Sequence, residues 1–187
     1  MAIEHPDPRP WDVLSSSFLY RKPWMTLRSD RVRLSNGTII DDFNILEYPD
    51  WVNVVAVTGE CEVVLVRQYR HGIRDVFYEL PAGVCDAEDP GHEESARREL
   101  LEETGYGGGV WSPLMTLSAN PSTHSNRNYS FLAVGVERLQ EPQLEDTEEI
   151  HVHPVSLDEL RRILDAGEIM QALHVAPLLR FLSSPNS

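Results

Sequence analysis

The chain has 187 residues, of which 41% are hydrophobic and 25% are charged, which is enough for one well-buried domain with some extra structure. Its formal net charge is −14 and it contains no cluster of Lys and Arg residues, so we exclude nucleic-acid binding through a basic surface. No apolar run is as long as a membrane span, no signal-peptide core stands at the start, and only Cys61 and Cys85 are present, so we expect a cytoplasmic protein with reduced thiols and no membrane association.

The first predicted element is a small antiparallel sheet made by residues of about 16 to 48. Charged and apolar residues alternate from Arg31 to Leu34, and a β-branched pair follows at Ile39 and Ile40. The dipeptide Asn36-Gly37 between them is typical of a tight turn that joins two antiparallel strands. This sheet precedes the rest of the predicted domain as an N-terminal arm.

Four large aromatic residues lie in or beside this arm. Aromatic side chains bury a large apolar area, so we expect most of the four to be core residues. Packing at a subunit interface and stacking on a base are the alternatives. The four residues are Trp11, Tyr20, Trp24 and Trp51.

The main sheet is predicted to begin with a hairpin. Two short runs of mostly β-branched residues, 54–57 and 63–66, flank Gly59. Residues 76–80 form a further extended run, which leads into the loop before an acidic helix. After that helix, residues 131–136 have the composition of another strand.

The acidic helix carries three carboxylates and ends at Gly105. At about 100° per residue, Glu99 and Glu103 lie one turn apart on nearly the same line, and Glu102 lies about 60° away. Carboxylates on one arc can hold metal ions, but such an exposed pair costs only about 0.2–0.5 kcal/mol, so a plain solvated face stays an alternative. A separate arc that can pack inward contains Ala96, Leu100 and Thr104.

Two further helices are predicted near the end of the chain. Residues 156–159 form a capping box that opens a helix, and Gly167 follows the end of that helix. Residues 173–182 carry apolar residues at helical spacing around Pro177. Strands and helices together indicate an α+β fold in which helices flank a mixed sheet.

The segment from 65 to 106 resembles the signature of the Nudix hydrolase family. In that signature a glycine and a glutamate precede the run Arg-Glu-aliphatic-any-Glu-Glu-any-Gly-apolar, and residues 98–106 match this run at every fixed position. Counting from Gly83 places Asp89 where the first glutamate belongs, and the loop 84–97 is one residue longer than the pattern. We therefore assign no role to Asp89.

Two flanking motifs resemble the branch of ADP-ribose and nucleotide-sugar pyrophosphatases: Val66-Arg67-Gln68-Tyr69-Arg70 and Glu79-Leu80-Pro81-Ala82-Gly83. The resemblance implies the Nudix α/β/α sandwich with a mixed sheet for residues 49–187. It also implies that residues 1–48, the β arm, join a partner subunit in a homodimer. An arm folded back on its own core is the alternative.

The resemblance also implies a metal site. Its ligands are the backbone carbonyl of Ala82 and the carboxylates of Glu99 and Glu103, and its ion is Mg²⁺, with Mn²⁺ as the alternative. Magnesium takes hard oxygen ligands and leaves places for substrate phosphate and water, which suits these residues. The number of ions stays open, and Glu102 is a further candidate catalytic residue.

Other candidate residues lie outside the helix. Glu148 matches the loop glutamate that acts as general base in this branch, and its rivals are Glu145 and Glu149. Arg70 is the candidate for gripping a phosphate, with a surface ion pair as the alternative. Glu79 could hold that arginine or a substrate hydroxyl.

Asn126 stands where ADP-ribose enzymes carry a loop glutamate, so we expect it to contact substrate. Because this exchange removes a negative charge, a different nucleoside diphosphate sugar is a rival to ADP-ribose. His124 in the same loop is either a substrate contact or simply solvated. The implied activity is Mg²⁺-dependent cleavage of the pyrophosphate to a nucleoside monophosphate and a sugar phosphate; the alternative is a non-catalytic module that senses nucleotide sugars.

Overall fold

The computed structural model describes residues 8–184. Within that range the chain forms two compact units. The first unit contains the described part of residues 1–48 together with the segment 120–126. The second unit contains residues 49–119 and continues from 127 to the end of the described chain.

The first unit is a three-stranded antiparallel sheet in the order β1 (Asp12–Lys22), β2 (Met25–Arg33), β3 (Ile39–Glu47). The predicted turn is present between β2 and β3, where the backbone N–H of Gly37 donates to the Leu34 carbonyl at 2.9 Å. The prediction of an antiparallel arm is therefore confirmed, although its first strand begins before residue 16. Segment 120–126 joins the unit through a bridge between Leu46 and His124.

The aromatic residues of this unit are more exposed than we expected. Trp11, Tyr20 and Trp24 are exposed by 45%, 46% and 69%. The expectation that most of these aromatic residues are core was therefore wrong. The physical reason is that no helix among the described residues of this unit covers its sheet, so its apolar side chains have little to pack against.

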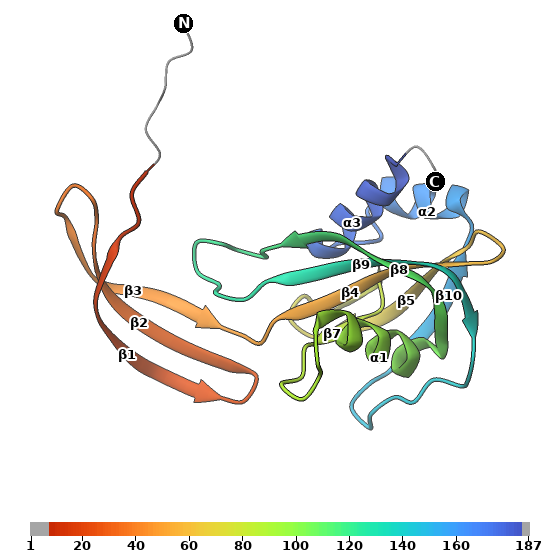
Figure 1. Ribbon diagram of the computed structural model, residues 1–187, viewed down its shortest axis with the longest axis horizontal. Coiled ribbons are helices and arrows are strands. Elements are labelled where there is room, and N and C mark those ends of the chain that lie inside the picture. The colour runs from red at the N-terminus through yellow and green to blue at the C-terminus, as the bar shows by residue number, and fades with distance from the viewer. Residues whose placement is uncertain (1–7, 185–187) are drawn as a thin grey trace, which may run out of the picture. The chain divides into compact units, whose positions relative to one another are not determined.

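The second unit is built on a seven-stranded mixed sheet (Figure 1). Its main path is β10-β5-β4-β9-β8, with β6 paired to β5 and β7 paired to β4. β4 and β9 run parallel, and the other neighbours run antiparallel. The strands are β4 (Trp51–Thr58), β5 (Val63–Arg70), β6 (Asp75–Glu79), β7 (Ala82–Val84), β8 (Tyr106–Leu117), β9 (Asn128–Arg138) and β10 (Ile150–Val155).

Helices cover both faces of this sheet. Successive side chains of β4 point to opposite faces, so those on one face pack against different helices from those on the other. Val52 and Val54 pack with Ala96 and Leu100 of helix α1 (His92–Thr104). On the other face, Val55 and Val57 pack with residues of α2 (Leu157–Asp165) and α3 (Ala172–Leu182). Figure 1 shows α1 on one side of the sheet and the α2–α3 pair on the other, so the predicted α/β/α sandwich is confirmed.

The predicted helix boundaries also agree with the structure. Ser156 caps α2, and its hydroxyl accepts a hydrogen bond from the Glu159 backbone N–H at 3.3 Å. Helix α3 contains Pro177, as the apolar spacing predicted. None of the helices described within residues 8–184 is long and apolar enough to cross a membrane.

Candidate active site

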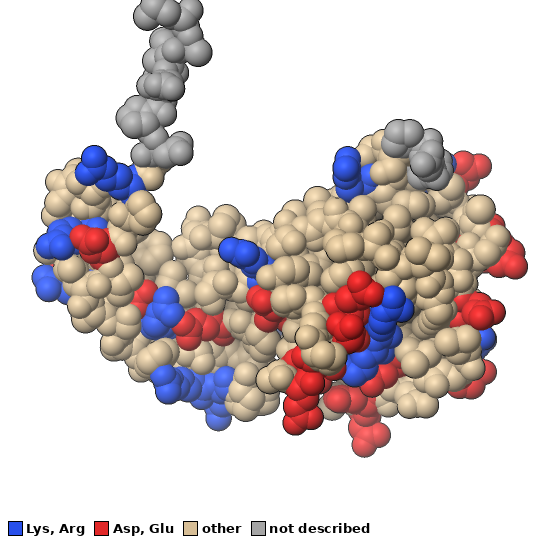
Figure 2. Space-filling view, viewed as in Figure 1, with Lys and Arg blue, Asp and Glu red and all other residues tan. Residues whose placement is uncertain are grey.

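Helix α1 places the three candidate carboxylates on one side of the second unit. The arc predicted to pack inward is buried, including Ala96 and Leu100, so the orientation of the helix on the sheet is fixed. Gly105 ends the helix in the left-handed conformation at φ 75°, and its N–H donates to the Leu101 carbonyl at 2.9 Å. On the face drawn in Figure 2, acidic side chains gather over α1 and the loops beside it.

The turn that contains β7 closes onto this helix. The backbone N–H of Ala82 donates to Oε2 of Glu103 at 2.9 Å. A Cβ atom at Gly83 would overlap the carboxyl group of Glu99, so glycine at this position leaves room for the Glu99 carboxylate beside the turn. The structure therefore brings together Ala82, Glu99 and Glu103, the three residues for which the resemblance implies a metal site.

Burial makes these carboxylates costly to ionise without a compensating charge. Glu103 is 6% exposed, and desolvation raises its pKa to about 8, against the opposing hydrogen bond from Ala82. Desolvation also raises the pKa of Glu99, while Arg98 opposes that shift. A cation with oxygen ligands would favour both ionised forms, so the donor set fits a hard divalent ion.

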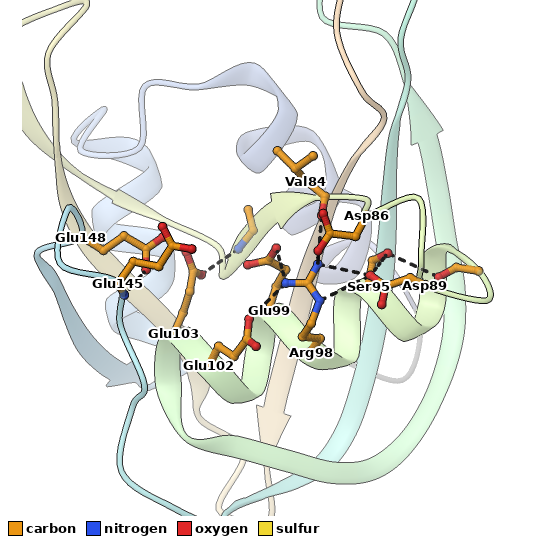
Figure 3. A network of polar contacts seen from close by, with 12 residues as sticks. Val84, Asp86, Asp89, Ser95, Arg98, Glu99, Glu102, Glu103, Glu145 and Glu148 are labelled. Atoms are coloured by element: carbon orange, nitrogen blue, oxygen red, sulfur yellow. Dashed lines mark hydrogen bonds and ion pairs between the residues drawn. The ribbon is translucent and has the colours of Figure 1, made fainter. Parts of the chain in front are cut away.

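Arg98 links the acidic residues on the outer side of the helix (Figure 3). Its Nη1 donates to Oε1 of Glu99 at 2.9 Å and to Oε2 of Glu102 at 3.0 Å. Its Nη2 donates to the Val84 carbonyl at 3.1 Å, which connects the helix to the β7 turn. Glu102 is therefore directed toward Arg98 and is the more exposed of the two carboxylates.

Asp89 connects the start of α1 to the same arginine. Its Oδ2 accepts a hydrogen bond from the Ser95 hydroxyl at 2.8 Å and another from Nη2 of Arg98 at 3.2 Å. The hydrogen bond from Ser95 is the main cause that lowers the pKa of Asp89. This position, to which the sequence assigned no role, thus helps to hold Arg98 in place.

Arg70 and Glu79 form a two-pronged ion pair. Nε of Arg70 donates to Oε1 of Glu79 at 2.8 Å, and Nη2 of Arg70 contacts Oε2 of Glu79. The Glu79 side chain is 5% exposed, whereas that of Arg70 is 43% exposed. Glu79 therefore holds the arginine, which was one of the two roles considered for it, and fixes the plane of a guanidinium that is open to solvent.

Two cavities meet at Arg70 and the β7 turn. The smaller, of about 420 Å³, is lined by the acidic residues of α1 and by the loop before β10. The larger, of about 530 Å³, lies toward α3. Arg70 and residues 82–84 line both of them. A molecule with a central pyrophosphate could therefore extend from the acidic cavity into the larger one.

Two of the three candidate general bases reach the acidic cavity. Glu145 and Glu148 line it, and Figure 3 shows both near Glu103. The Glu148 carboxylate accepts a hydrogen bond from the backbone N–H of Glu145 at 3.0 Å. Glu149 is exposed and is not among the lining residues. The geometry thus favours Glu148 and Glu145 over Glu149.

Asn126 belongs to a different unit of the fold from the residues described above. It is buried at 5% exposure and belongs to segment 120–126 of the first unit. Apart from His124, the other candidate residues lie in the second unit. Its role in substrate binding therefore stays a prediction. His124 of the same segment packs its ring near Tyr48, with 5.3 Å between the ring centroids, so it is not simply solvated.

Sequence reasoning missed one residue of the larger cavity, His174. This histidine lies on α3 and lines the cavity, although it is only 3% exposed. Its Nδ1 accepts a hydrogen bond from the Leu80 backbone N–H at 2.9 Å. No local pattern pointed to it, because its partner is 94 positions away in the chain.

Comparisons with known proteins agree with this geometry. The family model of the NUDIX domain matches residues 48–173, and that of the nucleoside diphosphate sugar hydrolase N-terminal domain matches residues 11–46. An ADP-ribose pyrophosphatase of Mycobacterium tuberculosis is 31% identical over 173 residues, which cover 90% of this chain and 82% of that protein. One from Bacillus subtilis is 31% identical over 143 residues, covering 75% and 76%.

A solved structure has the same fold. It is described as an ADP compounds hydrolase, and it matches with a TM-score of 0.80 at 21% identity over 95% of each chain. The NUDIX match covers more than half of this chain, and two relatives above 30% identity align with most of it. The chain therefore belongs to the Nudix family of hydrolases.

Proposed function

We propose that this Nudix pyrophosphatase cleaves the pyrophosphate of ADP-ribose or of a related nucleoside diphosphate sugar, giving a nucleoside monophosphate and a sugar phosphate. The observation that carries the proposal is the convergence of Ala82, Glu99 and Glu103 on a cavity that also presents Arg70. The named activity of the two relatives supports the substrate class.

The proposed cofactor is Mg²⁺, with Mn²⁺ as the alternative. The Ala82 carbonyl and the carboxylates of Glu99 and Glu103 would hold it. When bound, the ion would supply charge neutralisation for the phosphates and make water more acidic. The Ala82 N–H keeps the Glu103 carboxylate in place, and Arg98 does the same for Glu99 and Glu102.

Arg70 is proposed to bind a phosphate of the substrate. Glu79 fixes the orientation of its guanidinium, and the exposed side of the group faces both cavities. An arginine held in this way can donate two parallel hydrogen bonds to phosphate oxygens. The orientation of the arginine would therefore be set before substrate arrives, which lowers the entropic cost of binding.

Glu148 is proposed as the general base. It would take a proton from the attacking water, whose oxygen forms a bond to phosphorus while the bond from that phosphorus to the bridging oxygen breaks. The hydrogen bond from the Glu145 backbone orients the Glu148 carboxylate, and Glu145 is the second candidate because it lines the same cavity. Asn126 is proposed as a substrate contact that is neutral where ADP-ribose enzymes carry a glutamate.

We also propose that the protein is a cytoplasmic homodimer. On the first unit, Val13 and Leu19 are exposed by 61% each, and Trp24 is exposed by 69%. Exposed apolar surface of this kind marks an interaction site, and a second copy of the chain is the proposed partner. Both thiols, Cys61 and Cys85, are free, which supports a reducing compartment.

Hydrolysis of a panel of nucleoside diphosphate sugars, with and without Mg²⁺, tests the proposal. Loss of a metal ligand removes several kcal/mol of transition-state stabilisation, so Glu103→Gln is expected to lower kcat/KM by about 100- to 1000-fold. Glu94→Gln is the matched control, because Glu94 is an exposed carboxylate on the same helix. Product analysis by phosphorus NMR identifies the two monophosphates.

Two results would contradict the proposal. The first is hydrolysis that does not depend on a divalent ion. The second is a Glu103→Gln variant as active as Glu94→Gln. Tight binding of a nucleotide sugar without turnover in Mg²⁺ would instead support the sensing module.

A further inference from the structure

The larger cavity has an apolar wall and a small number of polar groups. Apolar side chains from the β5–β6 turn, β6 and the start of α3 form much of its lining, including Ile73, Phe77 and Leu173. Arg70 and Glu79 stand at one side of it, and they are already paired with each other. A ligand group in this cavity therefore meets mostly apolar surface and few hydrogen-bonding partners.

His174 lines this cavity, and its ring has one hydrogen-bond donor. Because Nδ1 accepts from the Leu80 backbone N–H, the proton of the neutral ring must be on Nε2. Among the described residues, this is the only hydrogen bond of the ring, so Nε2–H has no protein acceptor. Burial lowers the pKa of His174 to about 4, which keeps the ring neutral at physiological pH.

The position of this donor is rigid. Leu80 is fully buried, and its N–H fixes the plane of the imidazole. The side-chain amide of Asn53 donates to the Leu173 carbonyl at 2.8 Å, which ties the start of α3 to β4. Because the imidazole ring and the start of α3 are both held by hydrogen bonds, the Nε2–H points in one direction. It can therefore select ligands that place an acceptor in that direction.

If a ligand displaces water from this donor without offering an acceptor, binding loses about 1–3 kcal/mol, so a group bound here is expected to carry an acceptor. The acceptor should be uncharged. Arg70 is the better partner for a phosphate, and a carboxylate in the cavity would be repelled by Glu79. A hydroxyl, ring oxygen, carbonyl or ring nitrogen of an organic group satisfies these conditions.

On the basis of the proposed function, we propose that His174 determines specificity: its Nε2–H donates a hydrogen bond to an uncharged acceptor on the nucleoside or sugar group next to the phosphate bound by Arg70. The larger cavity then holds that organic group. A substrate without an acceptor at this place leaves the donor unsatisfied and binds more weakly.

Two substitutions test the roles of the two ring nitrogens of His174 separately. In His174→Asn the amide oxygen can replace Nδ1 as the acceptor for Leu80, but nothing replaces the donor at Nε2. In His174→Gln the amide nitrogen can replace Nε2–H, but the Leu80 N–H loses its partner. A purely structural role predicts that Asn is the milder change, and a specificity role predicts that Gln keeps substrate affinity.

The expected result is a split between KM and stability. His174→Asn should raise KM for the best substrate about 10-fold with little change in kcat, as loss of one neutral hydrogen bond predicts. His174→Gln should keep KM within about 2-fold of wild type while its Tm falls more than that of the Asn variant. Equal KM values in the two variants would overturn the proposal.

Binding measurements keep this test separate from the proposed function. Calorimetry with AMP and with ribose 5-phosphate, each without metal, measures the two halves of ADP-ribose and shows which of them occupies the cavity. If the wild type hydrolyses no compound of the panel, the proposed function fails. The His174 proposal still stands if Kd for one half rises only in the Asn variant. Equal Kd values in all three proteins, or no binding of either half, would overturn it.

Discussion

At the scale of single residues, the approach of Gly83 to Glu99 controls the geometry of the candidate metal site. A methyl group at position 83 would overlap the end of the Glu99 side chain, which is flexible, rather than any backbone atom. We therefore expect Gly83→Ala to fold with a Tm close to wild type while the Glu99 carboxylate is displaced. A shift of about 1 Å in a catalytic group can lower activity about 100-fold, and we expect a loss of that order in kcat/KM.

Gly59→Ala is the control for this prediction. A Cβ atom at Gly59 meets nothing within 4 Å, so the same chemical change is made in open space. Both variants are measured by thermal unfolding and by the hydrolysis assay. A fully active Gly83→Ala protein would show that the position of Glu99 does not matter for the reaction.

The residue scale also shows how far sequence reasoning reaches. Glu99 and Glu103 could be found because both lie on one helix, and helical spacing alone places them on one line. Their partner at Ala82 came from a resemblance, since no local rule brings a turn 21 positions away onto the helix. The sequence did not point to His174, because a single histidine in an apolar helix gives the same sequence pattern whether its side chain faces a cavity or the core.

At the scale of elements, Gly105 joins α1 to β8 in a place where a side chain does not fit. Its φ is 75°, and a Cβ atom there would overlap the backbone carbonyl of Gln140. Since backbone cannot move aside as a side chain can, we expect Gly105→Ala to lower the free energy of unfolding by more than 2 kcal/mol, adding strain of about 1–2 kcal/mol to a steric overlap of about 1–3 kcal/mol.

Gly108→Ala isolates the overlap from the strain. Gly108 has a similar φ of 71°, but a Cβ atom there meets nothing within 4 Å. We expect it to cost only the strain, about 1–2 kcal/mol, in urea unfolding followed by circular dichroism. If Gly105→Ala and Gly108→Ala lower the free energy of unfolding by the same amount, the overlap with the Gln140 carbonyl does not destabilise the Gly105→Ala protein.

Strand β8 is the longest of the strands that the sequence failed to predict. Its first half contains three consecutive glycines, 107–109, and Pro113 lies in its middle. Both residue types argue against a strand in the interior of a sheet. The structure accommodates them because β8 is at the edge of the sheet and, among the described strands, pairs with β9 alone. Edge position depends on the order of all the strands, and no single segment reveals it.

At the scale of the whole molecule, the main architecture followed from patterns that act locally. Alternation in the strands, the cap at Ser156 and the turn at Asn36-Gly37 each specify an element and its ends. The assignment of segment 120–126 to the first unit did not follow, because it depends on a pairing of Leu46 with His124 across 78 positions. Long-range pairing is therefore the information that sequence patterns lacked here.

The proposed homodimer is the property that belongs to the whole molecule, and the exposed apolar residues of the first unit allow a test. A second copy that covered Leu19 and Trp24 would remove them from water, so a charge at either position should weaken association. Light scattering at tens of micromolar should give the wild type about twice the chain mass of 21.2 kDa. The double variant Leu19→Glu, Trp24→Glu should give the mass of one chain.

Val110→Glu is the matched control, because Val110 is 78% exposed but lies on β8 of the second unit, and it should stay dimeric. A wild type with the mass of one chain, or a double variant that stays dimeric, would contradict the proposed interface.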